Sequence, residues 1–96
     1  MTGTLWLVSP VYFDVEAFRV LRERLLEAVR SNASLSGATV RFVVVDDSAG
    51  RDPEIAGLED LGDVQVTTPP FNLGHQRALV YGLRRVSATL HSHRTA

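Results

Sequence analysis

The chain has no cysteine and no lysine, and its formal net charge is only −1. The lack of cysteine excludes disulfides, thiolate zinc sites and a cysteine nucleophile. Because its charge is nearly balanced, the chain offers no basic face of the kind that binds nucleic acid or anionic lipid. No apolar run approaches the roughly 20 residues of a membrane span, and the first residues carry no positive charge as a signal peptide does. These absences predict a cytoplasmic protein without a nucleic-acid partner or a membrane segment.

Acidic residues are also missing from the last third of the chain, where no Asp or Glu follows Asp63. His91 and His93 lie two positions apart in this region, but no acid, cysteine or further histidine accompanies them in the tail. A structural zinc site needs about four such ligands, so no metal site is predicted.

The composition that remains is that of one globular domain. With 96 residues, of which 45% are apolar and 22% charged, the chain can form a core and is not of the disordered class. Three short apolar runs, at residues 4–9, 39–45 and 64–67, are bounded by turn-forming residues and predict buried strands. Because Pro10 cannot donate a ladder hydrogen bond, we expect the first strand to stop there.

A helical pattern separates the first two strands. Residues 15–30 carry their apolar side chains on one stripe, which is typical of an amphipathic helix. Asp14 is the expected N-cap of this helix, where its carboxylate would accept from the first turn. Phe13 and Phe18 have the spacing of a hydrophobic staple.

Two further helices are expected in the second half of the chain. Asp52 has the position of a cap and Pro53 that of a first-turn residue, which predicts a short helix from there to about Leu61. The last helix begins after residues 72–74. Within it Ala78 and Gly82, four positions apart, provide a groove of small residues for close packing.

The order β-α-β-α-β-α predicts an α/β fold of three layers, a Rossmann-like half with parallel strands in the order 3-2-1. Residues 1–88 form this half-domain, and residues 89–96 are expected to be a disordered tail. The strand at 4–9 would then lie at an unprotected apolar edge of the sheet. Such an edge predicts self-association or a partner that covers it.

Two acids, Asp46 and Asp47, follow the most apolar run directly. Open α/β sheets bind their ligands at the carboxyl ends of the strands, so this pair marks a candidate site. The same residues are also typical of Asx turns that merely end a strand. Asp47 is the stronger candidate for binding, and for Asp46 the two interpretations are even.

Three segments carry more specific information, in the order Val8-Ser9-Pro10-Val11-Tyr12-Phe13-Asp14, Val44-Val45-Asp46-Asp47-Ser48 and Asn72-Leu73-Gly74-His75-Gln76-Arg77-Ala78-Leu79-Val80-Tyr81-Gly82. Together they resemble the amino-terminal half of a family 2 glycosyltransferase with the GT-A fold. The last segment fits the family's Asn-x-Gly-xxx-Ala-xxx-Gly helix and is most similar to the polyprenyl-phosphate sugar transferases. Each segment alone is a weak signal, but three in this order over residues 4–86 are specific.

The resemblance implies an inverting transfer from a nucleotide-diphosphate sugar of the uridine or guanosine type. By position, six residues would contact the donor nucleotide: Pro10, Tyr12, Asp46, Asp47, Asn72 and Gly74. Tyr12 would lie against the base, and Asp47 would accept from the base imide or the ribose. A uracil-like ring offers an N–H donor and a π-face, so an acceptor and an aromatic wall suit it.

Two departures from the family pattern matter. Phe13 stands where the family usually has asparagine. The Asp-x-Asp that holds Mg²⁺ or Mn²⁺ in the family should follow Gly82, and it is absent together with the acceptor-binding half. Without that charge the leaving diphosphate lacks electrostatic stabilisation, usually the largest catalytic term. We therefore expect a truncated donor-binding half that is inactive alone, with no cofactor and no catalytic residue of its own.

Two alternatives stay open beside this interpretation. A non-catalytic remnant that needs a partner chain over the strand at 4–9 is compatible with the family resemblance. A receiver-like phosphoacceptor domain also uses paired acids at a strand end, but there the pair follows the first strand and a lysine is required. Since this chain has no lysine, the receiver-like alternative ranks far behind.

Overall fold

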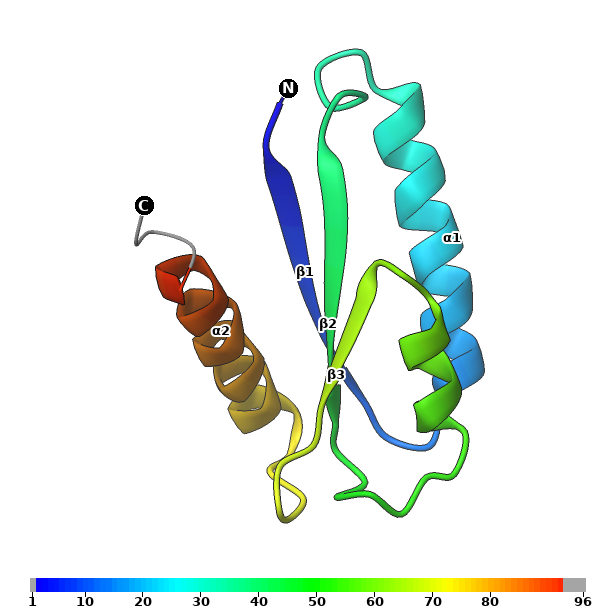
Figure 1. Cartoon of the computed structure of the whole chain (residues 1–96). Helices are drawn as coiled ribbons and strands as arrows, with labels where there is room; N and C mark the ends of the chain where they lie inside the picture. Colours follow the sequence, from blue (N-terminus) through cyan, green and yellow to red (C-terminus); the bar gives the residue numbers. More distant parts are fainter. Residues whose placement is uncertain (1, 93–96) are drawn as a thin grey trace.

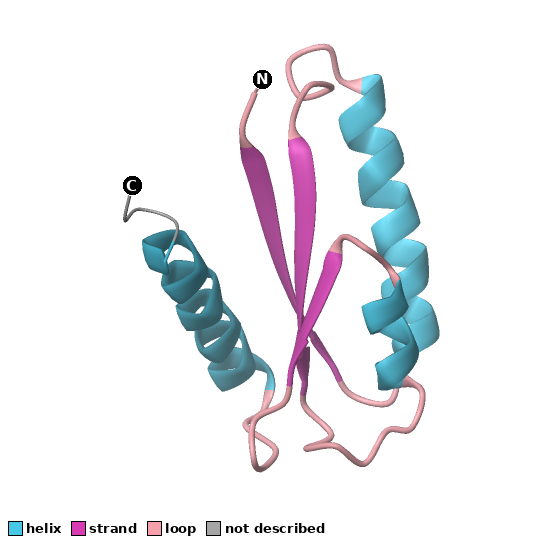
Figure 2. Cartoon of the chain, in the orientation of Figure 1, coloured by secondary structure: helices cyan, strands magenta, loops and turns pink. Residues whose placement is uncertain are grey.

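The computed structural model describes residues 2–92, and its helices and strands alternate along the chain (Figures 1 and 2). The elements are β1 (Thr4–Val11), α1 (Val15–Ser31), β2 (Thr39–Asp46), the 3₁₀-helix η1 (Ile55–Asp60), β3 (Val64–Thr67) and α2 (His75–Ser92). Within the described residues no helix is long and apolar enough to cross a membrane.

The strands form one parallel sheet in the order β1-β2-β3, so β2 is central and β1 and β3 are the edges. β1 pairs with β2 from Thr4 opposite Thr39 to Val11 opposite Asp46. α1 and η1 cover one face of the sheet, and α2 covers the other face, where it packs on β1 and β2 (Figure 1). The predicted α/β fold with three parallel strands is confirmed.

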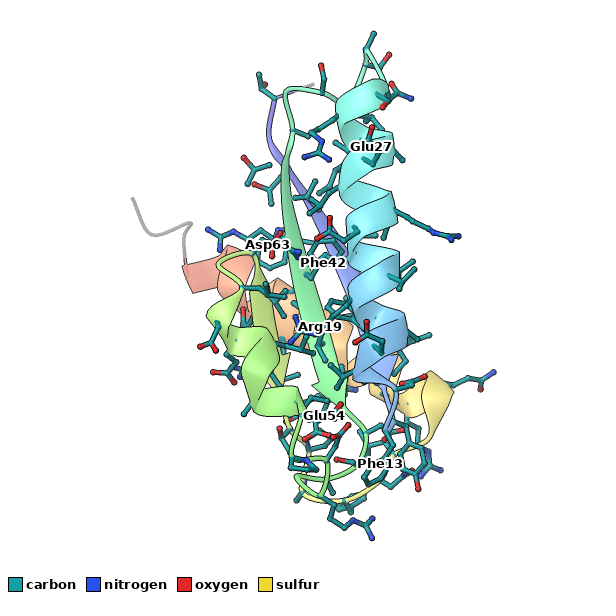
Figure 3. All side chains as sticks on the ribbon, turned by 90° about the vertical axis from the view of Figure 1, so that its right-hand side faces the viewer. Phe13, Arg19, Glu27, Phe42, Glu54 and Asp63 are labelled. Carbon is teal, nitrogen blue, oxygen red and sulfur yellow. The ribbon has the colours of Figure 1, made fainter. Side chains whose placement is uncertain are left out.

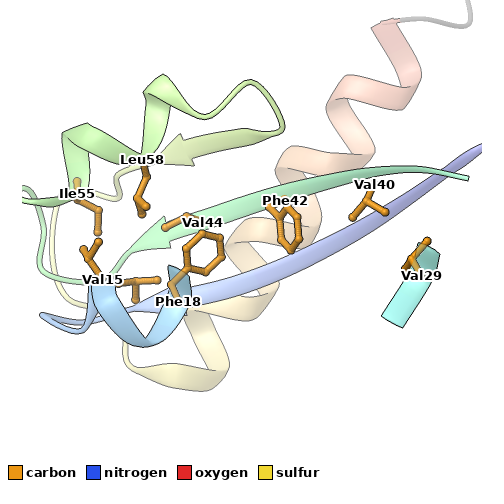
Figure 4. Packing of buried hydrophobic residues seen from close by; sticks show 9 residues of the cluster. Val15, Phe18, Val29, Val40, Phe42, Val44, Ile55 and Leu58 are labelled. Carbon is orange, nitrogen blue, oxygen red and sulfur yellow. The ribbon is translucent and has the colours of Figure 1, made fainter. Parts of the chain in front are cut away.

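β2 is apolar on both faces because helices cover both of them. On the α1 face, the ring of Phe42 meets that of Phe18 edge-on, with centroids 5.7 Å apart. On the α2 face, Val43 and Val45 are completely buried. The cluster on the α1 face joins residues of β1, α1, β2 and η1 (Figure 4): Val11, Val15, Phe18, Val29, Val40, Phe42, Val44, Ile55 and Leu58.

Small residues let α2 approach the sheet closely. Ala78 is 0% exposed. A Cβ at position 82 would overlap the Cγ1 atom of Val8 and lie 2.9 Å from the Cγ2 atom of Val45, closer than real Cβ atoms come to other atoms. Only glycine permits this approach, and the predicted groove at Ala78 and Gly82 is confirmed.

The prediction that β1 stops at Pro10 is wrong, because the strand continues to Val11. The carbonyl of Gly3 accepts from Thr39 N at 2.8 Å. The carbonyl of Val11 accepts from Asp47 N at 2.9 Å. Since the N–H and C=O of one strand residue point to the same side, odd-numbered residues of β1 face β2 and even-numbered residues face the open edge. The nitrogen of Pro10 therefore lies on the outer side, where a missing N–H breaks no ladder bond.

The start of α1 also differs from the prediction. Asp14 occupies the N-cap position, but its carboxylate accepts from Tyr12 N at 3.2 Å and makes no hydrogen bond to the first turn. Phe13 has a φ of 53° and is 52% exposed. Phe18 is buried against Phe42, so the two residues do not form the predicted staple. The left-handed backbone at Phe13 turns its ring away from the core.

The remaining helices are close to their predicted positions. The carboxylate of Asp52 accepts from Glu54 N at 3.0 Å. The predicted cap is nevertheless wrong, because the element that follows is a 3₁₀-helix from Ile55 to Asp60 whose N-cap is Glu54. α2 continues to Ser92, and residues 93–96 of the predicted tail lie outside the described residues.

Candidate functional site

Three loops meet at the edge where the strands end, at the bottom of Figure 1. They follow β1 (residues 12–14), β2 (47–54) and β3 (68–74). All six predicted contact residues lie in these loops or next to them: Pro10, Tyr12, Asp46, Asp47, Asn72 and Gly74. Asp46 and Asp47, at the end of β2, take part in the hydrogen bonds that join these parts of the chain.

Asp46 is completely buried and organises the turn after β2. Its Oδ1 accepts from the backbone N and the Oγ of Ser48, at 3.1 and 2.6 Å. Its Oδ2 accepts from Gly50 N at 3.2 Å and from Thr68 Oγ1 at 3.4 Å. Because both oxygens are engaged within the chain, Asp46 has the geometry of a turn-forming residue, and a ligand could reach it only if this turn opened.

Asp47 joins the end of β2 to both neighbouring loops. Its N–H donates to Val11 O on β1 at 2.9 Å. Its backbone carbonyl accepts from Asn72 Nδ2 at 2.9 Å, and its Oδ1 accepts from Leu73 N at 2.8 Å. The second carboxylate oxygen, Oδ2, has no hydrogen-bond partner among the groups that the structure describes. Asp47, which is 5% exposed, thus joins β1, the end of β2 and the loop after β3, and its Oδ2 is left without a partner.

Asn72 and Gly74 form the turn that starts α2. The Oδ1 of Asn72 accepts from Gly74 N at 3.0 Å. Gly74 has a φ of 79°, a left-handed conformation that glycine adopts without steric cost. Its carbonyl accepts from Ala78 N at 2.9 Å. The amino end of α2 therefore lies at the site, and free amides at such an end favour anionic groups.

Aromatic rings are exposed on the loops after β1 and β3. Tyr12 is 55% exposed, and its ring meets that of Phe13 edge-on at a centroid distance of 4.9 Å. Phe71, on the loop after β3, is 61% exposed. Pro10 is partly buried in β1, one residue before the strand ends at Val11. Exposed rings on neighbouring loops offer flat apolar faces to a planar ligand.

A hollow of about 290 Å³ lies at this edge, lined by Phe13, Asp52, Pro53 and Glu54. Figure 3 shows Phe13 and Glu54 at the same end of the molecule. Acids predominate around it, and the nearby guanidinium of Arg51 donates through Nε to Ser48 O at 3.0 Å. The negative balance of this hollow suits a ligand group that donates hydrogen bonds, such as a base or a sugar, whereas phosphate groups are favoured at the amino end of α2.

Among the described residues, no group of three or more His, Cys, Asp and Glu side chains is arranged to hold a metal ion. Of the four carboxylate oxygens of Asp46 and Asp47, three already accept hydrogen bonds from the chain. The residues present therefore do not fit a divalent cation. His93 and the side chain of His91 lie outside the described residues.

Sequence reasoning missed Ser48, which connects the turn to η1. It is completely buried, and its Oγ donates to Asp46 and accepts from the backbone N of Arg51 and Asp52, at 3.1 and 2.9 Å. The order Asp-Asp-Ser before a glycine is a signal for such turns, because short polar side chains compete for nearby backbone groups.

Searches against protein-family models, curated proteins and solved structures found no match to this chain. The site is therefore interpreted from its own geometry and from the three sequence segments that meet in it.

Proposed function

We propose that this chain is the donor-nucleotide-binding portion of a sugar transferase similar to family 2 glycosyltransferases, with a Rossmann-like GT-A half in which the strands have the order 3-2-1. The observation that carries the proposal is the set of hydrogen bonds made by Asp47. They join the three sequence segments that resemble the family, through Val11, Asn72 and Leu73. Residues far apart in the sequence thus converge on one acid at the carboxyl edge of the sheet, where α/β folds bind ligands.

The proposed ligand is a nucleotide-diphosphate sugar of the uridine or guanosine type. Asp47 Oδ2, which has no partner among the described groups, would accept from the base imide, and the exposed ring of Tyr12 would lie against the base. Asn72 and Gly74 would hold the loop and the first amides of α2 beside the nucleotide. Asp46 would hold the turn after β2 in place through its hydrogen bonds, and Pro10 would hold the end of β1 that precedes Tyr12.

The backbone of Phe13 adds support to the resemblance. Its φ of 53° is uncommon for an aromatic residue, whereas asparagine adopts this conformation several-fold more often. Asparagine is the residue that the family usually has here. The loop thus keeps a backbone that suits the family's residue although the side chain has changed.

The proposed role is binding and not transfer. A leaving diphosphate needs positive charge, and the site is surrounded mainly by carboxylates. The residues present do not fit the divalent cation that the family uses, so no catalytic step is assigned to this chain. Cytoplasmic location remains a prediction, which follows from the cytoplasmic supply of nucleotide sugars that the proposal requires.

Titration calorimetry with UDP and GDP tests the proposal. We expect weak binding, with a Kd of about 0.1–1 mM, since only one acceptor and one ring are free to recognise the base. Asp47→Asn keeps the Oδ1 acceptor for Leu73 N and replaces Oδ2 by a donor, so it should weaken binding about tenfold while the loop stays in place. Tyr12→Ala should weaken binding by a similar factor, because it removes the ring that lies against the base. The fold should tolerate the change, since this ring is exposed.

The matched control is Asp60→Asn, which removes an exposed carboxylate on η1 away from the three loops. It should leave the affinity unchanged. If a folded sample gives no heat with either nucleotide, or if Asp47→Asn and Asp60→Asn bind equally well, the proposed site is wrong.

A further inference from the structure

The open edge of β1 carries hydrogen-bonding groups that are not used within the chain. Odd-numbered residues of β1 face β2, as the bonds of Gly3 and Val11 indicate, so Thr4, Trp6 and Val8 point their N–H and C=O groups outward. Pro10 ends this row because it has no N–H. The edge therefore offers three consecutive outward positions to another strand.

No charged side chain protects this edge. The eight residues of β1 (Thr-Leu-Trp-Leu-Val-Ser-Pro-Val) contain none, whereas natural edge strands usually carry lysine or other charges that prevent pairing. The open edge therefore lacks the charges that usually prevent pairing.

Apolar side chains flank the edge on both faces of the sheet. On the α1 face, Leu21 is 44% exposed and, together with Ala17, lines a cavity of about 170 Å³ against Ser9 and Pro10 of β1. On the α2 face, Leu83 is 58% exposed. Since α2 faces the sheet with Ala78, Gly82 and Val86, helical geometry places Leu79 and Leu83 about a quarter turn away, on the side of the β1 edge.

We propose that β1 pairs with β1 of a second copy of this chain, antiparallel and across a two-fold axis, to form a continuous six-stranded sheet. One register uses every free N–H on the edge. Trp6 lies opposite Trp6 of the second copy, and Thr4 lies opposite Val8, so each of these residues both donates and accepts. Pro10 falls just beyond the paired segment, where its missing N–H costs nothing.

The same symmetry covers the apolar flanks. Neighbouring strands are about 4.8 Å apart, and α2 packs on β1 and β2. The two copies of α2 would then run about 10 Å apart on one face, within the range of packed helices. Leu83 would lie on the side of α2 that faces the second copy. Leu21 lies beside Ser9 and Pro10, so in this register it would face the first residues of β1 of the second copy on the opposite face. A second copy fits better than an unrelated strand because it brings an equally apolar and uncharged edge with matching flanks.

Amide hydrogen exchange combined with sedimentation tests this pairing. We expect the purified chain to shift from monomer to dimer between about 1 and 500 μM, a range suited to a modest interface. Over that shift the amides of Trp6 and Val8 should become protected, while those of Leu5 and Leu7, which already face β2, should change little. Trp6 is the only tryptophan, so its fluorescence should shift to shorter wavelength as the dimer forms.

Leu83→Glu should raise the dissociation constant of the dimer at least about tenfold, because it places a charge where α2 faces the apolar surface of the second copy. Leu21→Glu places a charge against the start of β1 of the second copy and should also raise the dissociation constant. Val20→Glu is the control, since Val20 is similarly exposed (47%) but lies on the side of α1 that points away from the sheet. It should change the dissociation constant less than about twofold. Circular dichroism confirms that each variant is folded.

A monomer over the whole concentration range would overturn the proposal. So would an association that leaves the Trp6 and Val8 amides exchanging as fast as in the monomer, because it would use another surface. The inference does not depend on nucleotide binding, and failure of one leaves the other intact.

Discussion

The two edges of the sheet differ in how they are protected. β3 is four residues long, and η1 lies against it. The segment that enters β3 is fixed by Asp63, whose carboxylate accepts two bonds from Arg22 of α1, at 2.9 and 3.1 Å. β1 is eight residues long and uncharged, and within the described residues no ion pair joins it to α1.

This difference shows which edge of the sheet is protected against pairing with another strand. Short length, a covering helix and charge are the means by which natural sheets prevent edge pairing, and β3 has the first two. β1 has only Pro10 at its far end. Both strands lie beside the same central strand, so the difference arises from the surroundings of each edge and not from the sheet itself. The β3 edge is closed, and the β1 edge is suited to an additional strand.

The largest expected effect is a difference in the free energy of unfolding between substitutions in the central strand and in β1. Phe42 of β2 is 1% exposed, and its register neighbour Leu7 of β1 is only partly buried. Phe42→Ala should lower the free energy of unfolding by about 3–5 kcal/mol, and Leu7→Ala by about 2 kcal/mol. Urea unfolding at low protein concentration measures both values.

If Leu7→Ala costs as much as Phe42→Ala under those conditions, the β1 edge is as well covered in solution as the central strand. The contrast between the two strands would then be wrong. A cost that grows with protein concentration would instead point to the dimer, because association stabilises the folded state by mass action.

A smaller effect is expected where α2 meets β1 and β2. Gly82→Ala should lower the free energy of unfolding by about 1–2 kcal/mol, because the overlap with Val8 and Val45 outweighs the better helix propensity of alanine. Gly62→Ala is the matched control, since a Cβ there meets no atom within 4 Å. Thermal unfolding of the two variants should differ clearly, and equal melting temperatures would show that α2 can move away from β1 without cost.

The smallest effect concerns the ion pair that fixes the segment entering β3. The Arg22–Asp63 pair is partly buried, with side-chain exposures of 17% and 22%, and a double-mutant cycle with Arg22→Ala and Asp63→Ala should give a coupling of about 1 kcal/mol. The exposed Glu27–Arg30 pair serves as the comparison. The hydrogen bond and the positive charge of Arg30 lower the pKa of Glu27 in the folded state. The pair therefore stabilises the fold at a pH above the unfolded-state pKa of Glu27, and this stabilisation is lost as the pH falls through the folded-state pKa. A cycle on this pair should give a clearly smaller coupling at neutral pH, because solvent screens two exposed charges. A coupling as large as that of Arg22–Asp63 would remove the distinction.

Much of the fold could be predicted from local patterns. The apolar runs identified all three strands, and the apolar stripe of residues 15–30 identified α1, because burial on a sheet or helix face imposes a fixed period. The spacing of Ala78 and Gly82 predicted close packing of α2 correctly. The errors fell at the ends of elements: Pro10, Asp14 and Phe13 were assigned by rules that consider only nearest neighbours.

The site shows the same division. The sequence indicated the turn at Asp46 and Asp47 and the turn at Asn72 and Gly74. It did not indicate that Asp46 is enclosed while Asp47 keeps one oxygen without a partner, because that depends on Ser48, Thr68 and the loop after β3 folding around them. Buried polar groups take partners from wherever the chain brings them, and sequence spacing does not reveal those partners.

The sequence by itself determined the kind of each main element, the parallel α/β arrangement and the two acids at the end of the central strand. These follow from periodicity and from the handedness of crossovers, which act locally. Only the tertiary structure decided that Pro10 continues β1, because the direction of its nitrogen depends on which side β2 occupies. It likewise decided that Asp47 makes the hydrogen bonds between the three segments, and which residues of β1 point their N–H and C=O groups outward. Each of these depends on contacts between residues distant in the chain, which no local pattern specifies.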